Sequence, residues 1–336
     1  MPRPAPLRPL LLVLALGTVL VLWTRVPEPS TGPMVRITIP QGSGFRSVAD
    51  SLAAHQLIGS SLWFRTLGRL RGVDRRVQAG VYDVPAGASA WEVLSILQEG
   101  KVALVRLTVP EGLTILELAD LAHDRLGIPG DSLEAVSRDT AFIRSLGIEV
   151  RRLEGYMLPE TYSLPLPVTA AGLLRAMVEE FTRRWNPAWD RRLDTLGLTL
   201  NELVTLASIV EGEARHDDER GTIAGVYLNR LRRGIALQAD PTVQYAIQLA
   251  TGERKTRLLF KDLEINSPYN TYLHPGLPPG PVNSPGVRSL EAALYPATVP
   301  WLYFVAGPDG YHIFSRTLEE HNRATAAVRH DRRNGR

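Results

Sequence analysis

The stretch TLNELVTLASIVEGEA, residues 199–214, predicts a helix that carries two glutamates in its last turn. Thr199 and Glu202 have the spacing of a capping box, in which each side chain accepts a hydrogen bond from the other residue's backbone N–H. Apolar residues follow at helical intervals and lead to Glu211, while Glu213 lies on an adjacent face. The stretch therefore predicts a helix that brings a carboxylate to the end of an apolar surface.

Glu211 is the candidate reactive group. A carboxylate held against Leu200, Val204 and Ala207 loses hydration and keeps its proton longer, which suits a general acid near neutral pH. Two other interpretations stay open. Glu211 can instead emerge into water or pair with Arg215, and Glu213 can take the same catalytic role.

The composition argues against other kinds of chemistry. The 336 residues include no cysteine, which excludes disulfides, thiolate metal sites and a cysteine nucleophile. Only three lysines are present, and none has an obvious pocket setting for a Schiff base. The net charge of +3 is too small to indicate the strongly basic surface that is typical of proteins that bind nucleic acid. Paired metal-binding histidines and phosphate-binding glycine loops are also missing, so no metal and no cofactor is predicted.

The amino terminus predicts a membrane anchor. Residues 10–23 form an unbroken run of apolar or small residues, with Arg3 and Arg8 before it and Arg25 after it. No small-x-small cleavage site follows, so an uncleaved anchor is favoured over a cleaved signal peptide. Arginines before the run favour a cytoplasmic amino terminus. We therefore expect a single-pass protein of the plasma (inner) membrane whose remaining chain is periplasmic or otherwise extracytoplasmic.

A short motif recurs in the first half of the chain. The segment VRITIPQG (residues 35–42) returns as VRLTVPEG (105–112) and, in shorter form, as VYDVPAG (81–87). A helical pattern follows each copy, and Ser89 with Glu92 forms a second predicted capping box. The strand–turn–helix pattern resembles the LysM module, which binds glycans that contain N-acetylglucosamine. The alternative is three ordinary β–α units with common turn chemistry.

The composition of the sequence changes near residue 153, where glycine and proline begin to cluster in long irregular stretches. Such loops, held by helices, often form a binding groove. The sequence therefore predicts an α+β protein in three parts. Residues 1–33 are a cytoplasmic tail, transmembrane helix and linker, and residues 34–108 are a small LysM-like β–α region. Residues 109–336 are a mixed α/β catalytic domain with groove loops, in which residues 109–150 form a connecting third β–α unit.

A series of motifs follows in the second half. They are LEGYMLPETY (153–162), ASIVEGEA (207–214), NRL (229–231), LQADPTV (237–243), SPYNTY (267–272), GLPPGP (276–281), SPG (284–286) and YFV (303–305). In order and number they resemble the YceG-like (MltG) family of endolytic murein transglycosylases. The resemblance extends over nearly the whole chain, including the anchor.

The resemblance implies a function and a set of site residues. It makes Glu211 the catalytic acid of a lytic transglycosylase, which cleaves MurNAc–GlcNAc β-1,4 bonds within glycan strands and leaves 1,6-anhydro-MurNAc ends. It further implies that the enzyme terminates nascent strands, with peptidoglycan synthases as partners. The implied substrate-binding or tuning residues are Glu160, Glu213, Gln238, Asp240, Tyr269 and Asn270.

The sequence is also compatible with two other functions. A muramidase that uses water would need a second carboxylate, for which Glu213, Glu160 and Asp240 are candidates. A non-catalytic scaffold that binds peptidoglycan would need none. Asp240 can instead cap a helix, and Asn270 can instead shape a turn.

Overall fold

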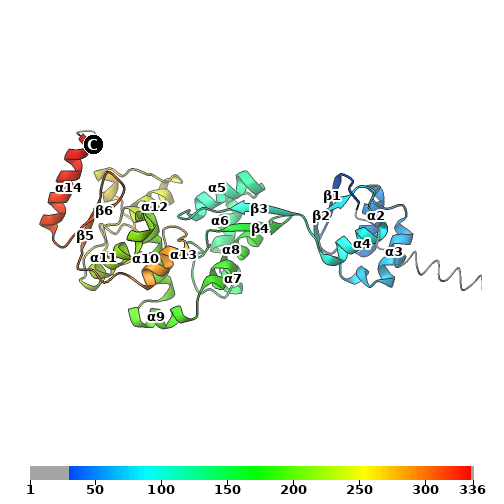
Figure 1. Cartoon of the computed structure of the whole chain (residues 1–336), viewed down its shortest axis with the longest axis horizontal. Coiled ribbons are helices and arrows are strands. Elements are labelled where there is room, and N and C mark those ends of the chain that lie inside the picture. Colours follow the sequence, from blue (N-terminus) through cyan, green and yellow to red (C-terminus); the bar gives the residue numbers. More distant parts are fainter. Residues whose placement is uncertain (1–29, 334–336) are drawn as a thin grey trace, which may run out of the picture. The chain divides into compact units, whose positions relative to one another are not determined.

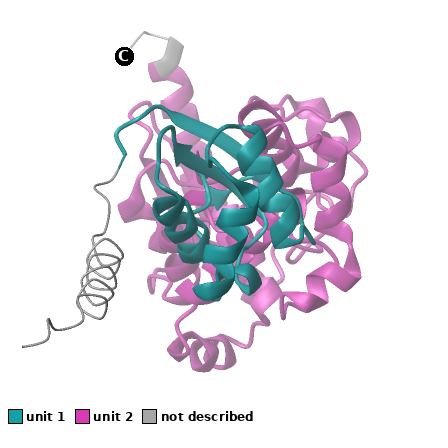
Figure 2. Cartoon of the chain, turned by 90° about the vertical axis from the view of Figure 1, so that its right-hand side faces the viewer, with its two compact units in different colours: residues 1–105, 164–167 teal, residues 106–163, 168–336 magenta. Residues whose placement is uncertain are grey.

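The computed structural model describes residues 30–333 and divides them into two compact units (Figure 2). Unit 1 comprises residues 30–105 and 164–167, and unit 2 comprises residues 106–163 and 168–333. The fold mixes helices with three small two-stranded sheets, as expected for the α+β class. The predicted membrane anchor, residues 10–23, lies outside the described residues.

Unit 1 begins with two strands separated by two helices. These elements are β1 (Met34–Ile39), α2 (Phe45–Ala54), α3 (Ser61–Leu70) and β2 (Gly80–Pro85), and α4 (Ala90–Glu99) follows. β1 and β2 pair antiparallel, with Val35 opposite Val84. Alternating residues of β1, Ile37 and Ile39, are buried and join a core formed with the helices. The predicted strand–turn–helix pattern of the repeats is thus confirmed.

The capping box predicted at the start of α4 forms only in part. The Ser89 hydroxyl accepts a hydrogen bond from the Glu92 N–H at 3.1 Å, as predicted. The Glu92 carboxylate, however, accepts a hydrogen bond from the Ser30 N–H at 3.1 Å instead of from Ser89. A segment distant in the sequence therefore takes the second half of the motif.

The chain passes between the units within β3 (Leu104–Thr108) and β4 (Thr161–Pro165), which pair with each other. Unit 2 continues from β3 into α5 (Ile115–Leu126), α6 (Gly130–Arg138) and α7 (Thr140–Ser145), and from β4 into α8 (Ala170–Arg184). α6 packs against both α5 and α8. At the carboxyl end, β5 (Tyr303–Ala306) and β6 (His312–Ser315) form an antiparallel hairpin against α14 (Leu318–Arg333).

The helix predicted from residues 199–214 is confirmed as α10 (Leu200–Glu213) and lies among its neighbours in the core of unit 2 (Figure 1). It packs against α11 (Arg220–Arg232), α12 (Asp240–Thr251) and α13 (Val287–Leu294). Residues 203–210 are all buried, so the burial of the helix extends beyond the apolar surface that leads to Glu211 and includes Thr205 and Ser208. Packing on three sides, together with the small side chains of this stretch, buries the whole circumference of the helix.

No single helix within residues 30–333 is both long and apolar enough to cross a membrane. The pair formed by α9 (Ala188–Leu196) and α10 meets the length and composition criteria only when taken together across an 87° bend.

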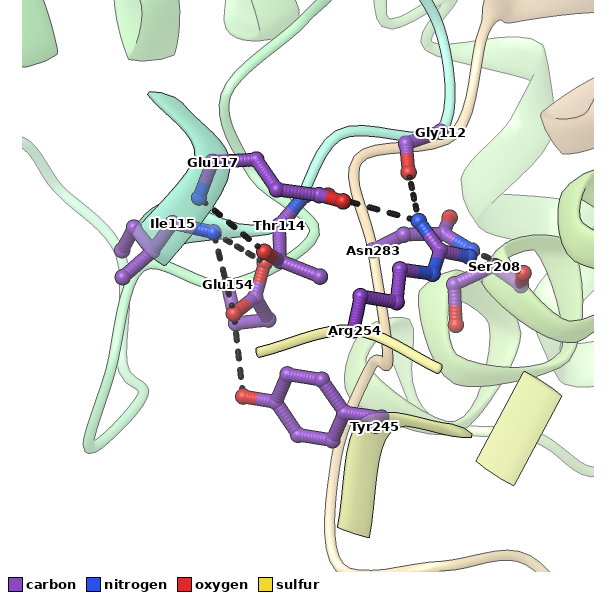
Figure 3. Close-up of polar contacts among 9 residues, drawn as sticks. All are labelled: Gly112, Thr114, Ile115, Glu117, Glu154, Ser208, Tyr245, Arg254 and Asn283. Atoms are coloured by element: carbon purple, nitrogen blue, oxygen red, sulfur yellow. Dashed lines mark hydrogen bonds and ion pairs between the residues drawn. The ribbon is translucent and has the colours of Figure 1, made fainter. Parts of the chain in front are cut away.

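The buried Glu154 fixes the start of α5 (Figure 3). One of its carboxylate oxygens accepts a hydrogen bond from the Ile115 N–H at 3.1 Å, and the other accepts one from the Tyr245 hydroxyl at 2.9 Å. A carboxylate is stabilised at this position because the first N–H groups of a helix are unpaired and carry a partial positive charge. Glu154 thus joins α5 to α12.

The same helix start is held from a second side. Thr114 and Glu117 form a full capping box, and Arg254 donates hydrogen bonds to Glu117 at 3.3 Å and to the Gly112 carbonyl at 2.9 Å (Figure 3). The loop of residues 110–114 is therefore fixed by charged side chains that lie far from it in the sequence.

We predict that replacing Glu154 changes how stability depends on pH. Burial raises the pKa of Glu154 from 4.5 to about 7, so between these values the folded state keeps a proton that the unfolded chain has released. The stability that this group contributes is complete below pH 4.5 and is lost as the pH rises through about 7. Relative to wild type, the free energy of unfolding of Glu154→Gln should therefore rise by about 2 kcal/mol between pH 5 and pH 8. Urea unfolding at several pH values measures this difference, and a constant difference would contradict the assignment.

Candidate active site

Two glutamates lie in the last turn of α10. The C-terminus of a helix carries a partial negative charge, so carboxylates there are destabilised unless cations or hydrogen-bond donors compensate them. Each glutamate has its own partner. Glu211 is compensated by Arg220 and the Gly286 backbone, and Glu213 is compensated by the Tyr227 hydroxyl.

The Glu211 side chain is only 6% exposed. Its Oε1 lies 3.1 Å from Nη1 of Arg220, and its Oε2 accepts a hydrogen bond from the Gly286 N–H at 3.0 Å. Arg220, not the Arg215 considered from the sequence, is therefore the ion-pair partner. Glu211 sits at the edge of the core, as the apolar residues before it predicted.

Arg220 is the first residue of α11, and its side chain is 9% exposed. Besides Glu211, it contacts Asp217 at 3.1 Å, and it donates a hydrogen bond to the Ser289 hydroxyl of α13. Since a guanidinium presents five N–H donors in a fixed plane, several acceptors can share it. Arg220 thereby joins α10, α11 and α13.

A further carboxylate, Glu111, lies against the same guanidinium. Its Oε2 is 3.9 Å from Nη2 of Arg220, and its side chain is 48% exposed. Partial burial and the charge of Glu211 raise the pKa of Glu111, while Arg220 and Arg288 oppose that rise. Glu111 therefore keeps its proton to a higher pH than an ordinary glutamate and is the acidic neighbour of Glu211.

A side chain at position 286 would have to displace the Glu111 carboxylate. A Cβ atom added there would lie 1.9 Å from Oε1 of Glu111, far inside van der Waals contact. The N–H of the same residue donates to Glu211. The Ser284-Pro285-Gly286 turn therefore brings backbone against both carboxylates at once.

Glu213 lines a separate cavity of about 360 Å³. Burial raises the pKa of Glu213 to about 7, and the charge of Asp240 adds to the rise. The Tyr227 hydroxyl donates a hydrogen bond to Glu213 at 2.7 Å. Gln238 and Asp240 line the same cavity, so three of the residues singled out in the sequence come together here.

The other residues singled out in the sequence lie elsewhere. Tyr269 lines a different cavity of unit 2. Asn270 is fully buried, and its amide bonds only backbone groups, including the carbonyls of Leu263 and Ile265 at 2.9 Å. Glu160 pairs with Arg184 of α8 at 3.2 Å. Within residues 30–333, no bond joins Glu160 to Glu211, and no group of three or more His, Asp or Glu side chains is arranged to hold a metal ion.

Sequence reasoning missed Glu111 and Arg220. A signal for Glu111 was present in the repeat, because the Pro-Glu-Gly of residues 110–112 replaces Pro-Gln-Gly at 40–42 and Pro-Ala-Gly at 85–87. Only the third copy carries an ionisable group at that place. Arg220 gave no such signal, because nothing local connects it to Glu211.

We predict that Arg220 and Glu211 are energetically coupled. Arg220→Gln leaves a buried carboxylate without its cation and should lower the free energy of unfolding by about 3 kcal/mol at pH 7. In a Glu211→Gln background the same substitution should cost clearly less, because no charge is left unpaired. Urea unfolding of the four proteins gives the coupling energy, and an equal cost in both backgrounds would argue against the pair.

Comparisons with known proteins agree with this architecture. The model of the YceG-like family matches residues 37–327. An endolytic murein transglycosylase of Bacillus subtilis is 34% identical over 88% of this chain and 85% of its own length. One of Streptococcus pneumoniae is 30% identical over 87% of this chain and 58% of its own length. A crystal structure of a YceG-like protein from Listeria monocytogenes is 32% identical and superposes with a TM-score of 0.60, covering 88% of this chain and 100% of the other. The chain therefore belongs to the YceG-like family.

Proposed function

We propose that this protein is an endolytic murein lytic transglycosylase, which cleaves β-1,4 bonds between N-acetylmuramic acid and N-acetylglucosamine within peptidoglycan strands. Similarity to relatives of that name supports the reaction and the substrate. The observation that carries the assignment to a site is the buried Glu211 at the end of α10, held between Arg220 and the Gly286 N–H and accompanied by Glu111. Glu211 is the proposed catalytic residue.

The reaction needs a single carboxylate that first donates and then accepts a proton. Protonated Glu211 gives its proton to the glycosidic oxygen as the bond to the anomeric carbon breaks. The C6 hydroxyl of the same muramic acid attacks that carbon and returns its proton to Glu211. The product ends in a 1,6-anhydro ring and no water is consumed, whereas hydrolysis usually needs two carboxylates.

Glu111 has a proposed supporting role in this cycle. Glu211 must carry a proton before cleavage, and its Oε1 lies 3.1 Å from the Arg220 guanidinium. Glu111 lies against the same guanidinium and holds its proton to a raised pH. We assign to Glu111 the role of a second acidic group that faces Arg220 while Glu211 carries its proton.

We assign the cavity beside Glu213 to sugar binding. Glu213, Gln238 and Asp240 offer donors and acceptors for hydroxyl and N-acetyl groups, and the Tyr272 hydroxyl donates to Asp240 at 2.7 Å. Gln238 has a φ of 49°, a conformation that is rare outside glycine and that concentrates at binding sites. Tyr269 is assigned to a neighbouring part of the substrate. For Glu160 and Asn270, direct binding remains a prediction from the sequence.

Unit 1 is the proposed LysM-like glycan-binding region. Its order of strand, helix, helix and strand, with the two strands antiparallel, supports this reading. A glycan-binding module on an endolytic enzyme would hold a strand during internal cleavage. The domain boundaries proposed from the sequence, 34–108 and 109–336, stand as part of the same proposal.

We further propose that residues 10–23 anchor the protein in the plasma (inner) membrane with the catalytic domain outside the cytoplasm. The apolar run and its flanking arginines support this topology. Peptidoglycan strands near the membrane are the nascent ones. This placement suits an enzyme that terminates new strands beside peptidoglycan synthases.

We predict that Glu211→Gln abolishes cleavage while the fold is kept. The amide preserves the shape of the side chain and an acceptor for the Gly286 N–H, but it has no proton to transfer. The release of soluble fragments from purified peptidoglycan should fall by about 10³-fold or more.

Glu179→Gln is the matched control, since Glu179 is an exposed glutamate of α8 outside the site. It should cleave at the wild-type rate. Substantial cleavage by Glu211→Gln, with an unchanged circular dichroism spectrum, would sink the assignment.

A different outcome is expected for Glu111→Gln. The pKa of Glu111 is raised by partial burial and by the charge of Glu211, so removing this carboxyl should change how activity depends on pH and not only its height. The pH profile of kcat/KM measures this change. A profile that is scaled down without a shift would show that Glu111 acts only through the structure of the loop.

A further inference from the structure

Unit 2 contains a second cavity, of about 560 Å³, in whose lining Tyr269 is the one residue that the proposed function assigns to the substrate. Its lining includes five charged residues and one tyrosine, which are Arg138, Glu149, Arg151, Arg152, Glu154 and Tyr269. The segment of residues 279–281 forms another wall. Arginines outnumber acidic residues in this lining, so the cavity is suited to a negatively charged group.

The two carboxylates compensate little of this positive charge. Glu154 is 2% exposed; its Oε1 accepts a hydrogen bond from the Ile115 N–H, and its Oε2 accepts one from the Tyr245 hydroxyl (Figure 3). Burial also raises the pKa of Glu154 to about 7, which reduces its mean charge near neutrality. Glu149 is exposed to solvent, where its charge is screened.

The arginines differ in how free they are. Arg138 pairs with Glu134 of its own helix at 3.0 Å. Arg152 is partly buried and donates one hydrogen bond, to the neutral Tyr245 hydroxyl at 3.2 Å. Within the described part of the chain, neither Arg151 nor Arg152 forms an ion pair with a carboxylate. Their remaining donors are therefore available to a ligand.

The cavity is connected to the catalytic residue by a short segment. Its wall at Pro281 continues through Val282 and Asn283, which are hydrogen-bonded to Ser208 of α10 at 3.0 and 2.9 Å, and reaches Gly286 beside Glu211. Five extended residues cover at most about 18 Å. The cavity therefore lies within a few sugar rings of the cleaved bond.

On the basis of the proposed function, we infer that this cavity binds a carboxylate of the peptide that peptidoglycan carries on its muramic acid residues. These peptides branch from every second sugar and end in carboxylates. Arg151 and Arg152 would form charge-assisted bonds with such a group, and Arg can do so through two parallel N–H donors. The enzyme would then recognise strands that still carry their peptides.

Binding measured in the full-length, cleavage-deficient Glu211→Gln protein tests this inference independently of cleavage. The probes are purified, fluorescently labelled glycan strands with their peptides and the same strands stripped by an amidase. Glu211→Gln should bind the peptide-bearing strands about tenfold more tightly or better. Adding Arg152→Gln should remove this preference. Arg151→Gln, a substitution at an exposed position, should reduce the preference and replaces Arg152→Gln as the test variant if Arg152→Gln disturbs the fold. Arg191→Gln, an exposed arginine of α9, is the matched control and should keep the full preference.

Equal affinity for the two kinds of strand in the Glu211→Gln protein would overturn the inference. So would an equal loss of affinity for both strands in the Arg151 and Arg152 variants, because it would indicate a structural role. Cleavage by the wild-type protein is measured separately on both strands. If neither is cleaved, the proposed function fails, while the binding preference still decides whether the cavity recognises the peptide.

Discussion

A carboxylate buried at the negative end of a buried helix is the constraint on which the site depends. Water cannot solvate the Glu211 carboxylate well, because the side chain is only 6% exposed. The partial negative charge of the helix terminus also disfavours a carboxylate there. Arg220 supplies the cation and the Gly286 N–H supplies a hydrogen bond. Arg220 in turn contacts Asp217 and Ser289. The residue that neutralises Glu211 therefore also fixes the relative positions of α10, α11 and α13.

The loop that carries Glu111 is held by a second set of interactions. Arg254 binds the Gly112 carbonyl, Glu154 binds the start of α5, and Asn283 binds the Ser208 carbonyl (Figure 3). The Gly112 N–H donates to the Ser284 carbonyl at 2.9 Å and the Ser284 N–H donates to the Leu113 carbonyl at 2.8 Å, which joins this loop to the segment that ends at Gly286. A rigid shell of this kind is what a reacting group needs, because catalysis depends on positions kept to within a fraction of an ångström.

The sequence predicted what depends on neighbouring residues. The start of α10 follows from the capping box of Thr199 and Glu202, and the strands of the repeats follow from alternation and turn chemistry. The sequence did not predict the side-chain pairs that form between distant segments. Arg220 replaces Arg215 as the partner of Glu211, and Glu111 reaches the site from 100 residues away. Only tertiary packing determines such pairs, and the burial of α10 on all sides depends on the same packing.

One carboxylate suffices in the proposed reaction because the substrate supplies its own nucleophile. Cleavage of purified peptidoglycan in water enriched in oxygen-18, followed at once by mass spectrometry of the new ends, tests this most directly. Attack by the C6 hydroxyl gives 1,6-anhydro ends that contain no oxygen-18. Reducing ends that carry one oxygen-18 atom per cleavage would contradict it, since water would then be the nucleophile and a second carboxylate would have to activate it.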